Sequence, residues 1–373
     1  MKIGISCYPT FGGSGVVATE LAMALAAGGD EVHVISYALP SRLSLADPRL
    51  TYHEVVVPHY PLFEYPPYSL ALATKMVEVA RHHDLDVLHV HYAVPNAVSA
   101  VLARQIMAPT PLHVVTTLHG TDITLVGNDP NFLETTRWSI DQSDAVTAVS
   151  QDLKRQTRVH FGTERPIDVV PNFIDPRRYE VARTLPNARR WARPGEKLLV
   201  HISNFRPVKR ILDVVEIFLR VRQQMPARLL LVGDGPDRAK VEQRCRGCEA
   251  FSDIVFLGNL PLVEEVLIGA DLFLLPSETE SFGLAALEAL SCEVPVIASK
   301  VGGLPEVVVD GECGALRPVG DVEAMAEAAI DLLSNDDKRR AFGAAGRRRS
   351  VEVFGEARVV AQYRSIYERV AGR

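Results

Sequence analysis

The sequence is poor in cysteine and tryptophan and has no excess of basic charge. Its 373 residues include five cysteines and two tryptophans. An odd number of cysteines without the spacing of a disulfide framework is typical of a protein from a reducing compartment. The formal net charge of −6 leaves no surplus of Lys and Arg to displace counterions from a nucleic acid. We therefore expect a cytoplasmic protein with no nucleic-acid partner.

Long apolar runs are also lacking. No uninterrupted run approaches the roughly 18 residues of a membrane span. Residues 1–8 are apolar, but Pro9 and two nearby glycines interrupt them, so they predict a first strand and not a signal peptide. The pair Cys245 and Cys248 has no second pair to complete a metal site, which favours an ordinary helical segment. We expect no integral membrane association.

The composition is that of a globular protein, with 47% apolar and 23% charged residues. Short apolar runs alternate with helical patterns, which predicts α/β structure with parallel, doubly wound sheets. The expected strands are residues 3–7, 31–37, 86–91, 112–117, 145–149, 167–170, 197–203, 229–232, 254–257, 272–275 and 296–298.

The alternation of strands and helices occurs twice along the chain, so we predict two domains. Residues 1–172 would form the first and residues 173–350 the second, with a polar, turn-rich linker region at 184–195. Residues 351–373 would form a terminal helix that packs back on the first domain. Two doubly wound domains create a cleft between their strand-end edges, where ligands commonly bind.

The stretch 277–288, SETESFGLAALE, follows an apolar run and has the order strand, turn, helix. The free N–H groups of such a turn attract anions such as phosphate. Glu280 and Glu288 flank it. A carboxylate can accept hydrogen bonds from sugar hydroxyls, but both glutamates could equally be solvated.

Other polar residues of the first half lie where strands are expected to end. A glycine-rich turn at 11–15, FGGSG, joins the first strand to a helix, and such a turn presents N–H groups or simply needs glycine. It lacks the GxGxxG spacing of a dinucleotide site.

His89 and His91 alternate on one strand and are interpreted mainly as core residues. The strand-end residues are Gly13, Ser14, Tyr92, Thr116, Thr117, His119 and Asp122.

The second half combines cations with glycine turns. Arg206, Lys209 and Arg210 follow one strand, and glycine turns occur at 233–235 and 302–303. Positive charge at a helix start is unfavourable to the helix dipole, so these cations are interpreted as ligands for phosphate. Together with the acidic pair they describe a nucleotide-sugar site.

At this point the motifs resemble those of the retaining GT-B glycosyltransferases of family four. The resemblance covers essentially the whole chain. It rests on the GGSG loop, HGTD, PNFID, the strand-end cations, GDGP, the two spaced glutamates and VGGLPE. Two narrower motifs, TTLHGTDITLVG and SNFRPVKR, are similar to those of the members that act in bacillithiol biosynthesis.

This resemblance implies UDP-N-acetylglucosamine as donor and L-malate as acceptor, with N-acetyl-α-D-glucosaminyl L-malate and UDP as products. The residues implied as catalytic are Lys209, Arg206, His119 and Glu280. Those implied in donor binding are Gly13, Asn204, Gly233, Gly235, Ser281, Phe282, Gly283, Leu284 and Glu288. Those implied in acceptor binding are Ser14, Tyr92, Thr117 and Arg206.

Within these sets the resemblance gives particular roles. Lys209 would bind the diphosphate, Glu280 the donor sugar and Glu288 the ribose, while His119 would meet an outer hydroxyl of the sugar. The broad family usually has Arg at the position of Asn204, so Arg206 could serve phosphate, the malate carboxylate or both. The implied reaction is on the front face, with no protein nucleophile, no cofactor and no metal.

Three other functions stay open from the sequence. One is a family-four transferase with another acceptor, such as inositol phosphate or a lipid-linked sugar. Another is a UDP-N-acetylglucosamine 2-epimerase on the same fold. The third is a non-catalytic nucleotide-sugar sensor or scaffold. The resemblance is also compatible with a homo-oligomer.

Overall fold

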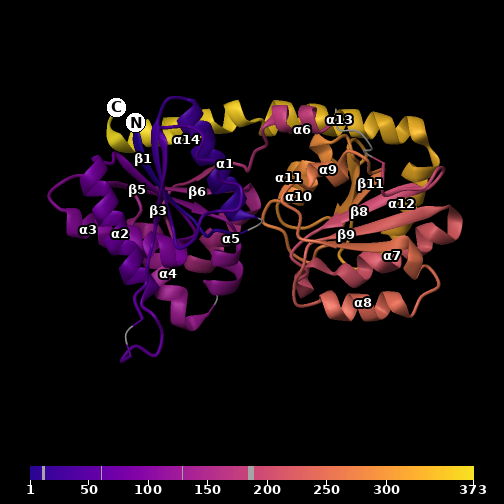
Figure 1. The fold of residues 1–373 in the computed structure, drawn as a ribbon, viewed down its shortest axis with the longest axis horizontal. Helices are drawn as coiled ribbons and strands as arrows, with labels where there is room; N and C mark the ends of the chain where they lie inside the picture. The colour runs from indigo at the N-terminus through magenta and orange to yellow at the C-terminus, as the bar shows by residue number, and fades with distance from the viewer. Residues whose placement is uncertain (11–12, 60, 128, 184–188) are drawn as a thin grey trace. The chain divides into compact units, whose positions relative to one another are not determined.

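A computed structural model describes residues 1–10, 13–59, 61–127, 129–183 and 189–373. The chain forms two compact units, shown in Figure 1. Unit 1 comprises residues 1–172 and 357–373, and unit 2 comprises residues 173–356. Phe11 and Gly12 of the glycine-rich turn lie outside the described residues, as do 184–188 of the expected linker.

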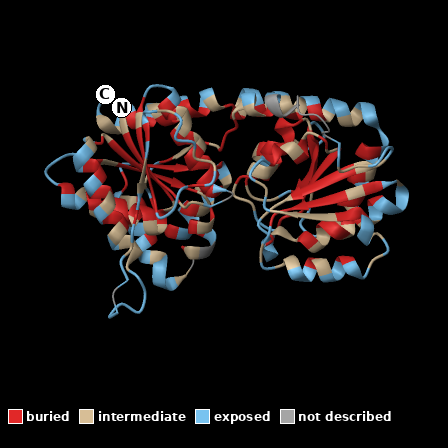
Figure 2. Ribbon diagram, in the orientation of Figure 1, coloured by how far each residue is buried: buried red, intermediate tan, exposed pale blue. Residues whose placement is uncertain are grey.

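Unit 1 is built on a seven-stranded sheet in the order β3-β2-β1-β4-β5-β6-β7. All neighbouring strands are parallel. Helices cover both faces of the sheet, so most of the strand residues are buried (Figure 2). Strands that are buried on both faces have mostly apolar sequences. The strands are β1 (Lys2–Ser6), β2 (Glu31–Ser36), β3 (Leu50–Glu54), β4 (Val87–His91), β5 (His113–Leu118), β6 (Ala145–Ala148) and β7 (Ile167–Val169).

The strand β4 shows how the two faces of this sheet are covered. Leu88 and Val90 pack with α2 (Tyr68–His83) and α3 (Val98–Met107) in one hydrophobic cluster. His89 points to the opposite face, where its Nδ1 lies 2.7 Å from the hydroxyl of Tyr367 on α14 (Glu356–Ala371). The helical segments are α1 (Ser14–Ala27), α2 (Tyr68–His83), η1 (Ala93–Ala97), α3 (Val98–Met107), η2 (Asp122–Val126), α4 (Pro130–Gln142), α5 (Gln151–Phe161) and α14 (Glu356–Ala371).

Unit 2 is built on a six-stranded parallel sheet in the order β10-β9-β8-β11-β12-β13. These strands are β8 (Lys197–Ile202), β9 (Ala227–Val232), β10 (Ile254–Gly258), β11 (Leu272–Leu275), β12 (Val296–Ser299) and β13 (Gly314–Arg317). The helical segments are α6 (Pro176–Arg183), η3 (Pro207–Lys209), α7 (Ile211–Gln224), α8 (Arg238–Arg246), η4 (Phe251–Asp253), α9 (Glu264–Leu267), α10 (Leu284–Ser291), α11 (Leu304–Val307), α12 (Val322–Ser334) and α13 (Asp336–Phe354).

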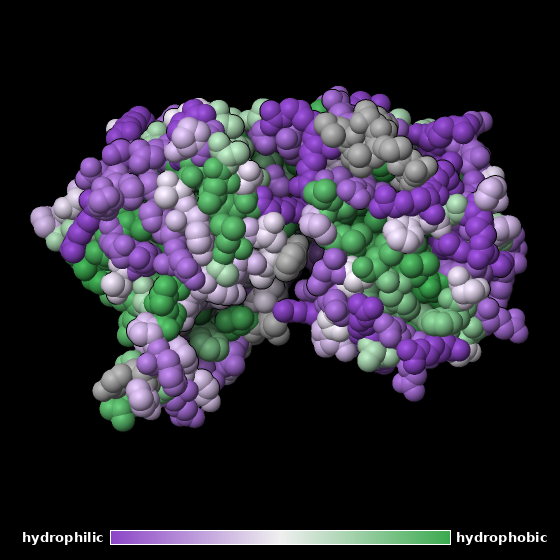
Figure 3. Space-filling model, viewed as in Figure 1, coloured by the Kyte–Doolittle hydropathy of each residue, from purple (hydrophilic) through white to green (hydrophobic). Residues whose placement is uncertain are grey.

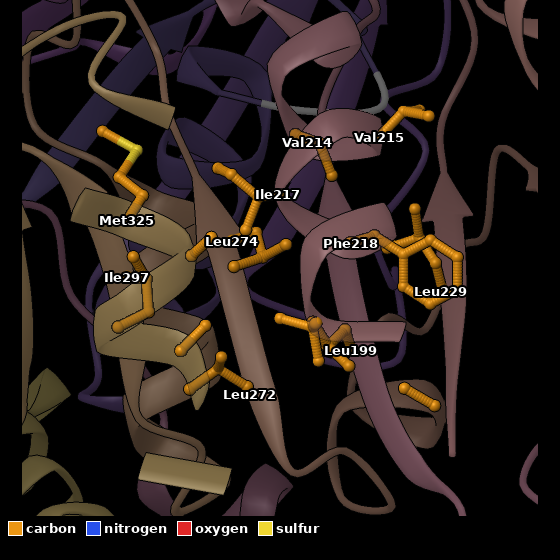
Figure 4. Packing of buried hydrophobic residues seen from close by; sticks show 14 of the residues in the cluster. Leu199, Val214, Val215, Ile217, Phe218, Leu229, Leu272, Leu274, Ile297 and Met325 are labelled. Atoms are coloured by element: carbon orange, nitrogen blue, oxygen red, sulfur yellow. The ribbon is translucent and has the colours of Figure 1, made fainter. Parts of the chain in front are cut away.

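The core of unit 2 lies between this sheet and the helices α7 and α12. Figure 4 shows Val214 and Phe218 of α7 in one cluster with Leu199, Leu229 and Leu274 of the sheet, and the Phe218 ring lies beside Leu229. Hydrophilic side chains dominate the visible surface over α8 and α13 (Figure 3). Within the described ranges, every helix is too short or too polar to meet the requirements of a membrane span.

The chain end differs from the expectation of one helix over 351–373. Helix α13 continues to Phe354 and remains in unit 2, and α14 begins at Glu356 and belongs to unit 1 from residue 357 onward. Gly355 separates the two helices in an extended conformation, with φ −68° and ψ 142°. Its backbone pairs with Ile174, so the two chain crossings between the units lie side by side.

Candidate active site

In unit 1, polar side chains gather where β4 and β5 end. His91 Nδ1 lies 2.8 Å from His119 Nε2, and the Tyr92 ring lies 5.4 Å from that of His119. Tyr92 has φ 83°, an uncommon value for a residue with a Cβ. Its backbone N–H donates to the Thr117 carbonyl at 2.9 Å, which fixes the strained residue beside the HGTD loop. The structure therefore brings Tyr92 and His119 together, as the strand-end rule predicts.

Asp122 organises the HGTD loop from within. Its carboxylate accepts hydrogen bonds from the backbone N–H groups of His119 at 3.1 Å, Gly120 at 2.8 Å and Ala93 at 3.2 Å. The residue is fully buried. Burial raises the pKa of Asp122 to about 6, against the opposing effect of these N–H donors. Asp122 thus positions His119, and does so through the backbone.

Thr117 does not lie where the sequence suggested. It was expected to line the acceptor pocket, but its side chain is fully buried. Its hydroxyl bonds with His89 Nε2 at 2.7 Å and with Thr147 Oγ1 at 2.6 Å. The reason is strand alternation, which places Thr117 on the same face as His89, under α14. Thr117 supports the site from below and is not exposed to a ligand.

Gly13 and Ser14 lie at the start of α1. Gly13 has φ 59°, a conformation that favours glycine, and it precedes the helix without a side-chain cap. Ser14 is buried. A Cβ at Gly15 would lie 2.5 Å from the Tyr8 carbonyl, so this turn needs glycine for close packing. The uncapped N–H groups of α1 also remain suited to an anionic or hydroxyl ligand.

In unit 2, two of the predicted site residues, Lys209 and Glu280, are in contact. Lys209 Nζ lies 2.5 Å from Glu280 Oε1, with side chains 19% and 12% exposed. Ser277 Oγ donates to the same oxygen at 3.0 Å. A backbone bond from Glu278 N–H to the Val208 carbonyl, 2.8 Å long, ties the two loops together. The structure therefore joins the SNFRPVKR and SETESFGL motifs at one place.

Glycines allow the loops around this pair to approach closely. A Cβ at Gly302 would lie 1.9 Å from the Glu280 carbonyl, and one at Gly235 would lie 2.0 Å from the Asn204 carbonyl. At Gly233 the corresponding distance to the Ser203 carbonyl is 1.8 Å. Real Cβ atoms do not approach so closely, so the glycines of GDGP and VGGLPE are required by backbone packing as well as by any ligand.

The turn before α10 is open for an anion. Gly283 has φ 98° and precedes α10 without a side-chain cap. Leu284 is the first residue of the helix, and Ser281 is partly exposed. Phe282 is buried and packs edge-on against Phe354. The N–H groups of this turn are thus held in place by the core behind them, which suits a diphosphate.

The remaining donor-side residues differ in exposure. Glu288 is buried within α10, and its charge contributes, after burial, to raising the pKa of Tyr179. Asn204 and Arg206 are exposed, and Arg206 immediately precedes η3. Arg206 therefore presents its charge to solvent, whereas Lys209 is held by Glu280.

Sequence reasoning missed the residues that support the Lys209 loop. His201 is fully buried; its Nδ1 bonds to the Leu274 carbonyl and its Nε2 to Ser203 Oγ, both at 2.8 Å. Ser203 Oγ in turn accepts from the Phe205 N–H at 3.3 Å. Burial lowers the pKa of His201 to about 4. In the sequence, the one sign of this supporting role is that His201 is a polar residue inside an otherwise apolar strand segment.

The chain resembles known glycosyltransferases in sequence. The model of Glycosyltransferase Family 4 matches residues 11–178, and that of Glycosyl transferases group 1 matches residues 187–349. The chain is 46% identical over 369 residues to N-acetyl-alpha-D-glucosaminyl L-malate synthase of Bacillus anthracis, covering 98% of this chain and 96% of that protein. It is 28% identical to D-inositol 3-phosphate glycosyltransferase of Mycobacterium marinum, covering 87% and 74%.

Solved structures show the same fold. HepE from Anabaena, in complex with UDP and glucose, has a TM-score of 0.82 and 19% identity, covering 98% of this chain and 99% of that chain. Sucrose-phosphate synthase from Thermosynechococcus elongatus has a TM-score of 0.78 and 22% identity, covering 99% of each chain. The two Rossmann-like units therefore have the GT-B fold, as predicted from the sequence.

Proposed function

The chain belongs to the family 4 glycosyltransferases, and we propose that it transfers N-acetylglucosamine from UDP-N-acetylglucosamine to the hydroxyl of L-malate. The products are N-acetyl-α-D-glucosaminyl L-malate and UDP, the first step of bacillithiol biosynthesis. The 46% identity to a malate synthase over nearly the whole chain supports this acceptor.

The contact between Lys209 and Glu280 carries the donor half of the proposal. In unit 2, the Lys209 ammonium lies 2.5 Å from the Glu280 carboxylate. This pair is beside the turn before α10, which has no side-chain cap. A diphosphate requires cations and N–H donors, and a sugar requires hydrogen-bond acceptors. Lys209 binds the diphosphate in this proposal, Glu280 the hydroxyls of the sugar and Glu288 the ribose diol.

The proposed reaction retains the anomeric configuration. The bond between the anomeric carbon and the β-phosphate oxygen breaks, and the malate hydroxyl oxygen bonds to that carbon from the same face. The departing phosphate oxygen takes the hydroxyl proton. Lys209 and Arg206 stabilise the charge that develops on UDP, so the protein acts by positioning and electrostatics, without a protein nucleophile, a metal or a cofactor.

The acceptor half is assigned to unit 1. Tyr92 and Ser14 line the malate pocket, and His119 contacts an outer hydroxyl of the donor sugar. The N–H groups bound to Asp122 hold the His119 loop in place. Arg206 is exposed and can bind a malate carboxylate as well as phosphate. We further propose that the enzyme acts in the cytoplasm and functions as a homo-oligomer.

The proposal is tested by following UDP release from UDP-N-acetylglucosamine with a panel of acceptors. The panel contains L-malate, D-malate, other hydroxy acids, inositol and inositol phosphate. Release that depends on L-malate is expected. Release with inositol phosphate but not with malate would assign another family 4 activity. Conversion of the donor to its 2-epimer without any acceptor would assign an isomerase.

A further inference from the structure

Three histidines come together in unit 1, away from the residues assigned to glycosyl transfer. They are His33 on β2, His53 on β3 and His83 at the end of α2. One ring nitrogen from each lies within 4.8 Å of the others. Among the side chains that the structure describes, this is the one group of three that is suited to hold a metal ion.

The fold explains why these residues meet. In the parallel pair of β2 and β3, His33 is opposite Thr51, so His53, two residues further on, points to the same face. Helix α2 ends at His83, only four residues before β4 begins at Val87. The His83 ring consequently lies against that of His33, with centroids 4.0 Å apart.

The hydrogen bonds of His33 determine which of its ring nitrogens carries the proton. Its Nε2 lies 3.0 Å from Glu31 Oε1, and its Nδ1 lies 2.9 Å from His53 Nε2. A carboxylate can only accept, so Nε2 carries the proton and Nδ1 presents a lone pair to the cluster. Metal-ligating histidines usually have this arrangement, in which a carboxylate holds the far nitrogen of the ring.

We propose that His33, His53 and His83 form a binding site for a divalent transition metal of the zinc class, oriented by Glu31. Imidazole nitrogens suit zinc, copper and nickel. In a tetrahedral zinc site with bonds of about 2.0–2.1 Å, ligand atoms lie roughly 3.4 Å apart. Rotation of the partly exposed His53 and His83 rings closes the remaining distance. The fourth position is left to water.

The position of the site implies a structural role. β3 is an edge strand, and α2 ends near the amino ends of the strands, opposite the edge where Tyr92 and His119 lie. A metal here would tie the edge strand and α2 to β2. It would stabilise unit 1 without taking part in the transfer reaction.

The test is calorimetric titration of the full, metal-free chain with Zn²⁺. We expect one ion per chain, and a rise in the midpoint of thermal unfolding on binding. The variants His53→Ala and His83→Ala, both at partly exposed positions, should bind at least about 10-fold more weakly. The control is His160→Ala, which removes an exposed histidine of α5 and should bind as the unchanged chain does.

A second measurement distinguishes specific binding at the three histidines from adventitious binding of the metal. Co²⁺ at three imidazoles should give the visible absorption of a four-coordinate ion, and Glu31→Gln should weaken Zn²⁺ binding by roughly 10- to 100-fold. UDP release should be unchanged in His53→Ala. The proposal is overturned if the unchanged chain does not bind Zn²⁺, or if His53→Ala and His83→Ala bind Zn²⁺ as tightly as the unchanged chain does.

Discussion

At the scale of single residues, Lys209 has the largest predicted effect on turnover. Its ammonium is the cation held in the donor loops by Glu280, and in the proposed reaction it faces the charge that develops on UDP. Lys209→Ala should lower kcat by about 100- to 1,000-fold, with little change in the midpoint of thermal unfolding.

The matched control for this prediction is Lys240→Ala, which removes an exposed lysine of α8 and should leave kcat unchanged. Steady-state UDP release measures both variants. Near-normal turnover of Lys209→Ala in a folded protein would remove Lys209 from the reaction.

Glu288 should affect binding of the donor more than the chemical step. A carboxylate that accepts two ribose hydroxyls contributes about 1.5–3 kcal/mol through hydrogen bonds to a charged group. Glu288→Ala should accordingly raise the KM for UDP-N-acetylglucosamine by about 10- to 100-fold, while the KM for L-malate stays the same. Glu327→Ala, at an exposed position of α12, is the control. An unchanged donor KM excludes Glu288 from the ribose site.

At the scale of elements, the buried hydroxyl of Tyr367 links the terminal helix α14 to the strands that carry the site. Tyr367 bonds to His89, which bonds to Thr117. Tyr367→Phe would leave a buried ring nitrogen without its partner, at a cost of about 1–3 kcal/mol. We expect the free energy of unfolding to fall by that amount in urea titration. Tyr65→Phe, at a residue 78% exposed, should change nothing, and equal stability of the two variants would contradict the link.

The sequence predicted the strands better than the contacts between elements. Fully buried parallel strands such as β11 give continuous apolar runs, and Leu272–Leu275 was predicted with its observed bounds. The edge strand β3 is half exposed, and the sequence of residues 47–68 predicts a strand plus a loop there without fixing the bounds of the strand. The contact of His89 with Tyr367 spans 278 positions, and no local pattern carries such information.

The candidate site was predictable in the same uneven way. Residues at strand ends follow from topology, so the proximity of Tyr92 and His119 was predictable. The buried position of Thr117 was not found, because it depends on which face of the sheet α14 covers. The three backbone N–H groups on Asp122 also depend on loop conformation that the sequence does not reveal.

At the scale of the whole molecule, buried histidines make stability depend on pH. The pKa values of His89 and His119 are lowered to about 3, and those of His201 and His53 to about 4, mainly by burial. Unfolding returns each to its ordinary value of 6.5. Between these values the unfolded chain binds protons that the folded chain does not, so stability falls as the pH falls below 6.5.

Asp122 has the opposite effect. Its pKa is raised to about 6 from 3.8, so the folded chain holds one proton more than the unfolded chain in that window. The five groups together should take up about three protons on unfolding at about pH 5. Urea titrations at neutral and mildly acidic pH measure the slope. A stability that is constant or rises on acidification would contradict these protonation states.

The stereochemistry of the product tests the proposed reaction most directly. Purified protein is incubated with UDP-N-acetylglucosamine and L-malate, and the anomeric proton is followed by NMR together with UDP. We expect equal amounts of UDP and N-acetylglucosaminyl L-malate, with the α configuration in the first product formed. A β-linked first product, or donor hydrolysis that L-malate does not change, would contradict it.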